Sequence, residues 1–134
     1  MQLVRSAAAA LACVSIACTS STTSSSNSGN QAPPGATTIT IQDFTYSPST
    51  VTIKVGQTVY WKNMGPSEHS STADGGAWDS GGLASPGGGN GYGGGSAGGS
   101  YTYTFNMAGT YAYHCKFHPP DMYPNFKGTI NVTP

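Results

Sequence analysis

The most informative stretch of the sequence is residues 109–118, which read GTYAYHCKFH. Successive side chains of an extended strand point to opposite faces of a sheet, so Tyr113 and Cys115 share one face and His114 points to the other. If the tyrosine faces the core, the thiol of Cys115 also points inward and is shielded from solvent. We therefore expect a buried thiol at a strand end, a turn that brings His118 beside it, and His114 on the surface.

Alternation of apolar and polar residues continues through the rest of the chain. Short runs of this kind, separated by Gly and Pro turn signals, are typical of a β-sandwich or barrel. The predicted strands are residues 38–41, 51–55, 58–62, 101–105, 110–115 and 129–132. No segment shows a helical repeat. The sequence therefore predicts one all-β domain over residues 38–134.

A glycine-rich segment, residues 75–100, interrupts this pattern. Trp78, Leu83 and Tyr92 are its only large side chains. A long mobile loop is the simpler interpretation, because segments of this length without alternation usually lie on the surface. A flexible flap that touches a partner protein is the alternative.

The N-terminal part of the chain is predicted to lie outside the domain. Residues 1–18 combine Arg5 with a short, alanine-rich apolar run, as in a secretory signal peptide. The run ends at Cys18 in a pattern that resembles a bacterial lipoprotein processing site; ordinary signal cleavage is the alternative. Residues 19–37 are rich in Ser, Thr, Asn, Gly and Pro and are expected to form a disordered linker. We expect an exported domain, in the periplasm or at the cell surface, with a membrane tether through lipid on Cys18.

The charge balance limits the class of partner. The chain has five basic and five acidic residues and a formal net charge of zero. A nucleic-acid-binding surface requires clustered Lys and Arg, which this sequence lacks. Docking by strong electrostatic steering is also not expected. The sequence therefore predicts a protein that does not bind nucleic acid, and we separately expect a monomer.

The cysteine count points to a metal. Cys115 is the only cysteine in residues 38–134. Exported domains meet an oxidising compartment where cysteines are normally paired, so an unpaired one needs an explanation. Cys115 with His69 and His118 would form the ligand set that copper accepts in electron-transfer sites, with a weak thioether such as Met122 as the fourth ligand. Zinc accepts the same Cys and His ligands.

Taken together, these motifs resemble the cupredoxins, small blue copper proteins of the plastocyanin, pseudoazurin and amicyanin type. The matching residues are 44–48, 51–59, 61–63, 69, 109–115, 118–119 and 127–130, in this order. The resemblance implies a Greek-key β-sandwich with one copper ion at one end, held by His69, Cys115 and His118. It also implies a carrier of single electrons between redox partner proteins, not an enzyme.

The fourth, axial ligand is predicted to be Met122. Related proteins place methionine two or four residues beyond the histidine, close before the final strand, and Met122 follows His118 after three intervening residues. Counting back from the last predicted strand puts Phe126 near the usual place. Met64 and Met107 are further candidates, which we expect to pack as ordinary apolar residues.

Two features beside the expected site have more than one interpretation. Glu68 directly precedes His69, and a carboxylate close to the ion would favour the oxidised metal. The residues that follow His118 are mainly apolar: Pro119, Pro120, Met122, Tyr123, Pro124 and Phe126. They either pack as a loop or form a patch for brief docking of a redox partner near His118.

Other function classes are less consistent with the sequence. A Cys–His pair can act as a nucleophile in acyl transfer, but nothing around Cys115 indicates an oxyanion hole. A copper oxidase or nitrite reductase would need more histidines than the three present. A copper- or zinc-binding protein without a redox role remains the alternative that the ligands alone leave open.

Overall fold

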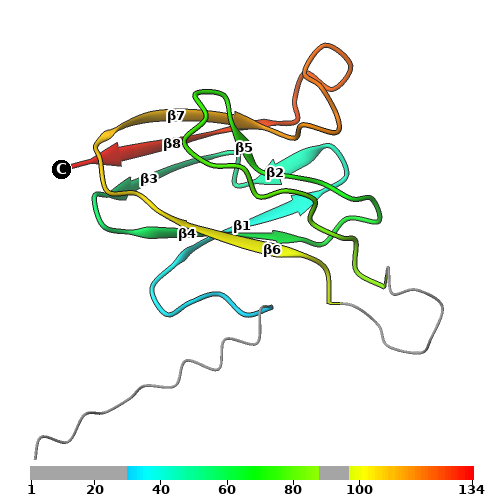
Figure 1. Ribbon diagram of the computed structural model, residues 1–134, viewed down its shortest axis with the longest axis horizontal. Helices are drawn as coiled ribbons and strands as arrows, with labels where there is room; N and C mark the ends of the chain where they lie inside the picture. Colours follow the sequence, from blue (N-terminus) through cyan, green and yellow to red (C-terminus); the bar gives the residue numbers. More distant parts are fainter. Residues whose placement is uncertain (1–29, 88–96) are drawn as a thin grey trace, which may run out of the picture.

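The computed structural model describes residues 30–87 and 97–134, which form a sandwich of two four-stranded β-sheets (Figure 1). One sheet has the strand order β2-β1-β4-β6, and the other has the order β3-β8-β7-β5. The described residues contain no helix, so the prediction of an all-β sandwich is confirmed. The strands are β1 (Thr37–Gln42), β2 (Thr45–Ser47), β3 (Thr50–Lys54), β4 (Thr58–Asn63), β5 (Thr72–Ala73), β6 (Ser100–Thr104), β7 (Gly109–His114) and β8 (Lys127–Thr133).

Several neighbouring strands are far apart in sequence. β1 pairs with β4 and β3 pairs with β8, both in parallel, whereas β4 with β6 and β7 with β8 pair antiparallel. The chain therefore crosses repeatedly between the two sheets, as the Greek-key arrangement requires. β7 lies between β8 and β5 inside its sheet, which fixes where the residues that follow it emerge.

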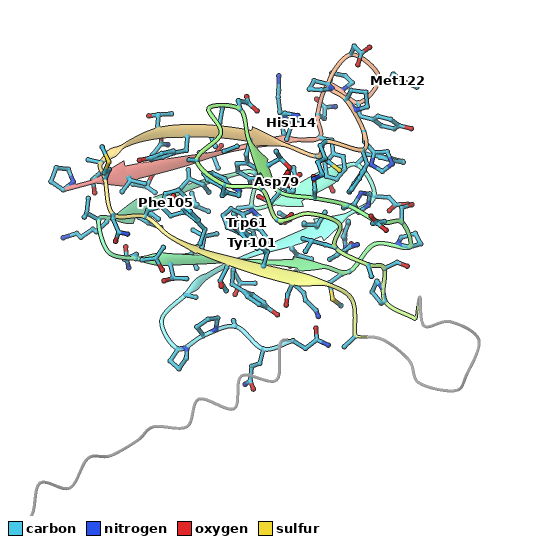
Figure 2. All side chains as sticks on the ribbon, viewed as in Figure 1. Trp61, Asp79, Tyr101, Phe105, His114 and Met122 are labelled. Carbon is cyan, nitrogen blue, oxygen red and sulfur yellow. The ribbon has the colours of Figure 1, made fainter. Side chains whose placement is uncertain are left out.

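Alternation explains which side chains fill the space between the sheets. Ile39 and Ile41 of β1 are fully buried, while their neighbours in the strand are more exposed. Ile130 of β8 follows the same rule. Figure 2 shows Trp61 and Phe105 between the two sheets, and both are buried. Large aromatic side chains dominate this core and supply much of its buried apolar area.

The described part of the glycine-rich segment packs on this core. Trp78 and Leu83 are each only 4% exposed. The rings of Trp78 and Trp61 lie 5.5 Å apart, a contact worth about 0.5–1.5 kcal/mol beyond area burial. Residues 75–87 are thus attached to the core by two large buried side chains, while the mobility of the segment stays a prediction. Residues 88–96 lie outside the described residues.

The orientation of β7 agrees with the alternation in its sequence. Tyr113 and Cys115 are fully buried, whereas the side chain of His114 is 29% exposed. Nδ1 of His114 lies 2.6 Å from a carboxylate oxygen of Asp74 at the surface. Tyr113 faces Gly128 of β8, and a Cβ at that position would overlap the tyrosine ring. Only glycine fits there, because the two strands approach closely under a bulky ring.

The N-terminal predictions fall on residues that are not described. The predicted signal peptide (residues 1–18), the lipid site at Cys18 and residues 19–29 of the predicted linker all lie outside the described residues. Within the two described ranges, no helix has the length and apolar character needed to cross a membrane.

Candidate metal centre

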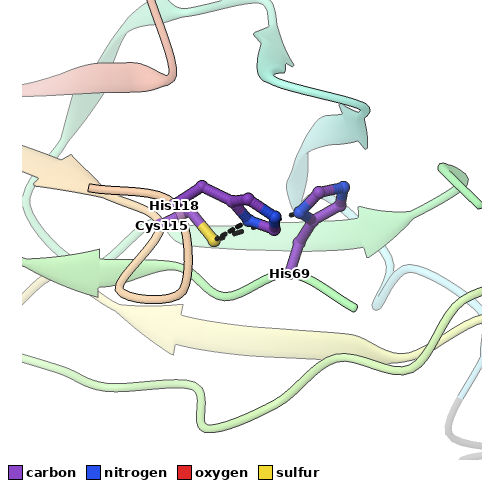
Figure 3. A group of neighbouring side chains, drawn as sticks. All are labelled: His69, Cys115 and His118. Atoms are coloured by element: carbon purple, nitrogen blue, oxygen red, sulfur yellow. Dashed lines mark hydrogen bonds between the residues drawn. The ribbon is translucent and has the colours of Figure 1, made fainter. Parts of the chain in front are cut away.

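Three side chains from distant parts of the sequence meet at one end of the sandwich (Figure 3). His69 lies between β4 and β5, Cys115 directly follows β7, and His118 lies in the connection to β8. The backbone N–H of His118 donates to the carbonyl oxygen of Cys115 at 3.2 Å, which closes a tight turn. This turn brings the imidazole back to the thiol, as the spacing predicted.

His69 is held by backbone hydrogen bonds to a neighbouring segment. Its backbone exchanges two hydrogen bonds with Leu83, of 3.1 and 2.7 Å. Asn63, the last residue of β4, is fully buried, and its side-chain amide donates to the carbonyl oxygens of Leu83 and Ser67, each at 2.8 Å. These bonds tie two connecting segments together, so His69 is positioned by a fixed backbone.

The distances among the three side chains suit a single metal ion. Sγ of Cys115 lies 3.5 Å from Nδ1 of His118 and 4.0 Å from Nδ1 of His69. Three such ligand atoms, one from each residue, lie within 4.8 Å of one another. Two ligands bound at about 2.0–2.3 Å to one ion are about 3.5 Å apart, so these residues fit such an ion. A thiolate with two imidazoles is a donor set that copper and zinc accept.

The thiol of Cys115 lies in an environment that favours its ionised form. The backbone N–H of Ser70 points at Sγ from 3.3 Å. The hydroxyl of Ser70 lies 3.9 Å from Sγ and accepts the backbone N–H of Lys116 at 2.9 Å. Burial by itself would raise the pKa of the thiol. The contacts with His69, His118 and the N–H of Ser70 outweigh burial and lower the pKa of the thiol to about 6.

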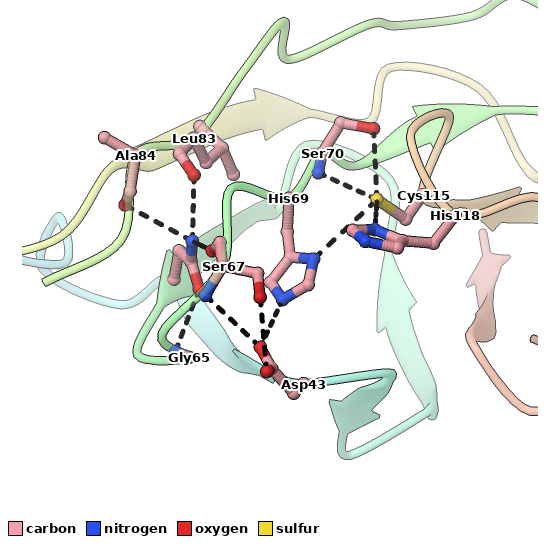
Figure 4. A network of polar contacts seen from close by, with 10 residues as sticks. Asp43, Gly65, Ser67, His69, Ser70, Leu83, Ala84, Cys115 and His118 are labelled. Atoms are coloured by element: carbon pink, nitrogen blue, oxygen red, sulfur yellow. Dashed lines mark hydrogen bonds and ion pairs between the residues drawn. The ribbon is translucent and has the colours of Figure 1, made fainter. Parts of the chain in front are cut away.

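A carboxylate contacts the outer edge of His69. Nε2 of His69 lies 2.9 Å from Oδ1 of Asp43 (Figure 4). The same oxygen accepts the backbone N–H of Ser67, and Oδ2 of Asp43 accepts the hydroxyl of Ser67. A hydrogen bond at Nε2 leaves Nδ1 free to face the thiol. Burial opposes protonation of His69, but its contacts with Cys115 and Asp43 outweigh burial and raise its pKa.

The carboxylate beside the site is therefore not the one that directly precedes His69. Glu68 is exposed. Asp43 instead lies in the turn between β1 and β2, followed by Phe44 with a φ of 61°, a left-handed conformation that reverses the chain there. Asp43 and His69 are 26 residues apart, and no local motif links them.

Aromatic rings enclose the two imidazoles. Phe126 is fully buried, and its ring lies 4.9 Å from the ring of His69 and 5.9 Å from that of His118. Phe44 and Tyr123 stack on each other at 4.3 Å, and their rings lie 5.2 and 5.1 Å from His118. The three rings form an apolar wall beside the ligand atoms.

Met122 lies apart from these groups. Its side chain is 69% exposed, and Figure 2 shows it at the outer end of the connection that follows β7. The backbone N–H groups of Met122 and Tyr123 both donate to the carbonyl oxygen of Pro119 at 3.0 Å, so the connection turns back at this point. The role of Met122 as a ligand therefore remains a prediction.

Sequence comparison assigns the chain to a family. Residues 34–133 match the copper binding proteins of the plastocyanin/azurin family. The chain belongs to this family. A plastocyanin of Scenedesmus fuscus is 38% identical to this cupredoxin over 87 residues, which are 65% of the present chain and 85% of the plastocyanin.

Solved structures agree with the fold of this cupredoxin. The Cu(I) form of an amicyanin variant matches it with a TM-score of 0.58 and 24% identity, over 77% of this chain and 87% of the amicyanin. A purple cupredoxin from Nitrosopumilus maritimus matches with a TM-score of 0.53 and 22% identity, over 72% of this chain and 99% of that protein.

Copper is accordingly the cofactor of this cupredoxin, and His69, Cys115 and His118 are positioned to form its site. The sequence pointed to Cys115 and His118 through their spacing after a strand, and to His69 through its place behind another strand, while alternation excluded His114. It gave no sign of Asp43, whose place beside the site depends on how the turn after β1 packs.

Proposed function

We propose that this cupredoxin carries single electrons between redox partner proteins outside the cytoplasm. One copper ion, held by His69, Cys115 and His118, would be the redox centre. The observation that supports this most strongly is the meeting of one buried thiol of lowered pKa with two imidazoles at the end of a β-sandwich.

The role of the protein in this function is to keep the metal ligands in fixed positions. Bound copper supplies one-electron chemistry, alternating between Cu(I) and Cu(II). Ser70 holds the Cys115 thiolate through its backbone N–H, and Asp43 orients the ring of His69. A site whose ligands barely move between the two oxidation states has a small reorganisation barrier, which favours rapid electron transfer.

We propose that electrons pass between the copper site and a partner protein through His118. This residue is half-buried, whereas His69 and Cys115 are fully buried. Two apolar residues that are close to His118 in sequence, Phe117 and Met122, are 44% and 69% exposed. They would give the surface near His118 an apolar character. A redox partner would dock there briefly, over a small and weakly charged interface. We propose that the protein acts as a monomer and has no catalytic activity of its own.

Export and membrane attachment are part of the same proposal. Residues 1–18 would direct export, lipid on Cys18 would anchor the protein, and residues 19–37 would serve as a flexible tether. Mass spectrometry of the mature protein tests this directly. A mature chain that begins with a lipid-modified Cys18 is expected, and an unmodified or absent Cys18 would refute the anchor.

The metal assignment is tested by adding Cu(II) to the copper-free protein. An intense blue thiolate-to-copper band with narrow copper hyperfine splitting in electron paramagnetic resonance is expected, together with a reversible one-electron wave. The matched variant Cys115→Ser removes only the sulfur and should abolish the band. Tight binding of copper or zinc with no reversible wave would instead support a metal-binding protein without a carrier role.

A further inference from the structure

The fourth position of the site is the feature that the structure describes most differently from the sequence pattern. A thioether can bind only if it reaches the same ion as the three strong donors. Met122 is 69% exposed at the outer end of a turn that two hydrogen bonds to Pro119 close. Binding by Met122 would require this turn to open and the side chain to bury itself beside the imidazoles.

The space beside the imidazoles is already filled by Phe126. The ring of Phe126 meets that of His69 edge to face, with an interplanar angle of 88°, and it is also close to His118. Its ring also lies 4.8 Å from the ring of Tyr46. The backbone N–H of Phe126 donates to the carbonyl oxygen of Tyr123 at 2.9 Å, directly before β8 begins. Phe126 is therefore fixed by ring contacts, by a backbone bond and by the strand that follows.

Two buried side-chain oxygens in this part of the molecule are already engaged in hydrogen bonds. The hydroxyl of Tyr46 donates to the carbonyl oxygen of Ser70 at 2.5 Å. The side-chain oxygen of Asn63 accepts the backbone N–H of Gly65 at 2.9 Å. The group that contacts both imidazoles is the aromatic ring of Phe126.

We propose that Phe126 occupies the axial side of the copper site and that Met122 is not a ligand. The inference rests on the proposed function, and it deepens that function by assigning the site three protein ligands. A weak axial donor tunes the reduction potential, and a wall of carbon gives no electron density to the more highly charged Cu(II). Loss of that donor favours Cu(I) and raises the potential. The carrier is thus suited to passing its electron to an acceptor that is a strong oxidant.

Two single substitutions in the full chain separate Phe126 from Met122. Met122→Leu changes an exposed side chain with little risk to folding, and it should leave the reduction potential and the Cu(II) paramagnetic resonance spectrum unchanged. Phe126→Met places a thioether beside both imidazoles, so it should lower the potential and alter the spectrum. Phe126→Leu is the matched control, because it opens similar space without a donor and should not lower the potential. Circular dichroism would show whether each variant retains the all-β fold.

Each outcome decides a different point. X-ray absorption at the copper edge should show one short copper–sulfur distance in the unmodified protein and add a second, longer one only in Phe126→Met. A changed potential or spectrum in Met122→Leu, or no change in a folded Phe126→Met variant, overturns the axial assignment while the carrier function stands. Absence of the blue band in the unmodified protein overturns the proposed function itself.

Discussion

The two imidazoles of the candidate site are held in different ways. His69 is fully buried, hydrogen-bonded to Asp43 and attached to a backbone that exchanges two bonds with Leu83. His118 is half-buried, lies in a connection between strands, and is surrounded by the rings of Phe44 and Tyr123.

This difference gives the two histidines different roles. Polar contacts around His69 fix its tautomer and favour positive charge on the metal. Apolar rings around His118 exclude water while leaving part of the residue accessible to a partner. A site used for electron transfer needs both features, since its ligands must be rigid and one of them must approach the surface.

Removal of each ring in turn should have the largest effect. His118→Gly opens a gap at the surface, which free imidazole can fill, so the blue band should disappear and then return when imidazole is added. His69→Gly leaves a buried cavity beside Asp43, so imidazole should not restore the band and the free energy of unfolding should fall by about 2 kcal/mol. Absorption spectra and denaturant unfolding measure both effects. Equal restoration of the two variants would contradict the difference in access.

The thiol between the two imidazoles should titrate far from its usual range. In the copper-free protein the pKa of Cys115 is lowered from 9.0 to about 6. This shift increases the acid dissociation constant of the thiol about a thousandfold. Ultraviolet absorbance of the thiolate should therefore appear as the pH rises through about 6. In His118→Gln the midpoint should rise but stay below 9.0, since His69 and the N–H of Ser70 still favour the thiolate. A midpoint near 9.0 in the unmodified protein would show that these contacts do not hold the ionised form.

Loss of the carboxylate beside His69 should weaken the site without removing a ligand. Asp43→Asn is expected to reduce copper affinity by about 10–100-fold, as for other residues that orient a metal-bound histidine. It should also raise the reduction potential, because a negative charge near the ion favours Cu(II). Glu68→Gln makes the same chemical change at an exposed neighbour and should alter neither quantity. Competition titration and voltammetry compare the two variants, and equal effects would remove the special role of Asp43.

The apolar surface near His118 should show the smallest effect. Phe117→Glu puts a charge next to the proposed docking patch, so electron exchange between Cu(I) and Cu(II) copies of the protein should slow by about 2- to 10-fold through charge repulsion and desolvation. The reduction potential should not move. Met107→Glu adds the same charge at a residue that is 72% exposed in the turn between β6 and β7, and it serves as the control. Nuclear magnetic resonance line widths give the exchange rate, and equal slowing by both variants would argue against docking at this end.

Much of the fold and part of the site could be predicted from local patterns. Alternation with a period of two identified the strands and placed the thiol of Cys115 on the inner face of its sheet, where it is fully buried. The same pattern put His114 on the surface. The types of donor, one thiol and two imidazoles, indicated a metal because the chemistry of these side chains does not depend on the fold.

Other features depend on contacts between segments that are distant in sequence. Asp43 contacts His69 only because the turn after β1 folds over the segment that precedes β5. Residues 75–87 read as a loose loop, yet Trp78 packs on Trp61 from the opposite sheet. A local pattern carries no information on such contacts, since they arise from packing of the two sheets and their connections.

The connection between Cys115 and β8 shows what local sequence patterns determine and what depends on tertiary contacts. The sequence by itself determined which donors are available and that Cys115 and His118 lie on either side of a short turn. Only the tertiary structure decided that Phe126 is buried against both imidazoles while Met122 is exposed. The physical reason is that Phe126 is the only fully buried residue between the turn at Pro119 and the strand that begins at Lys127. Burial of its large ring removes more apolar surface from water than burial of a thioether would.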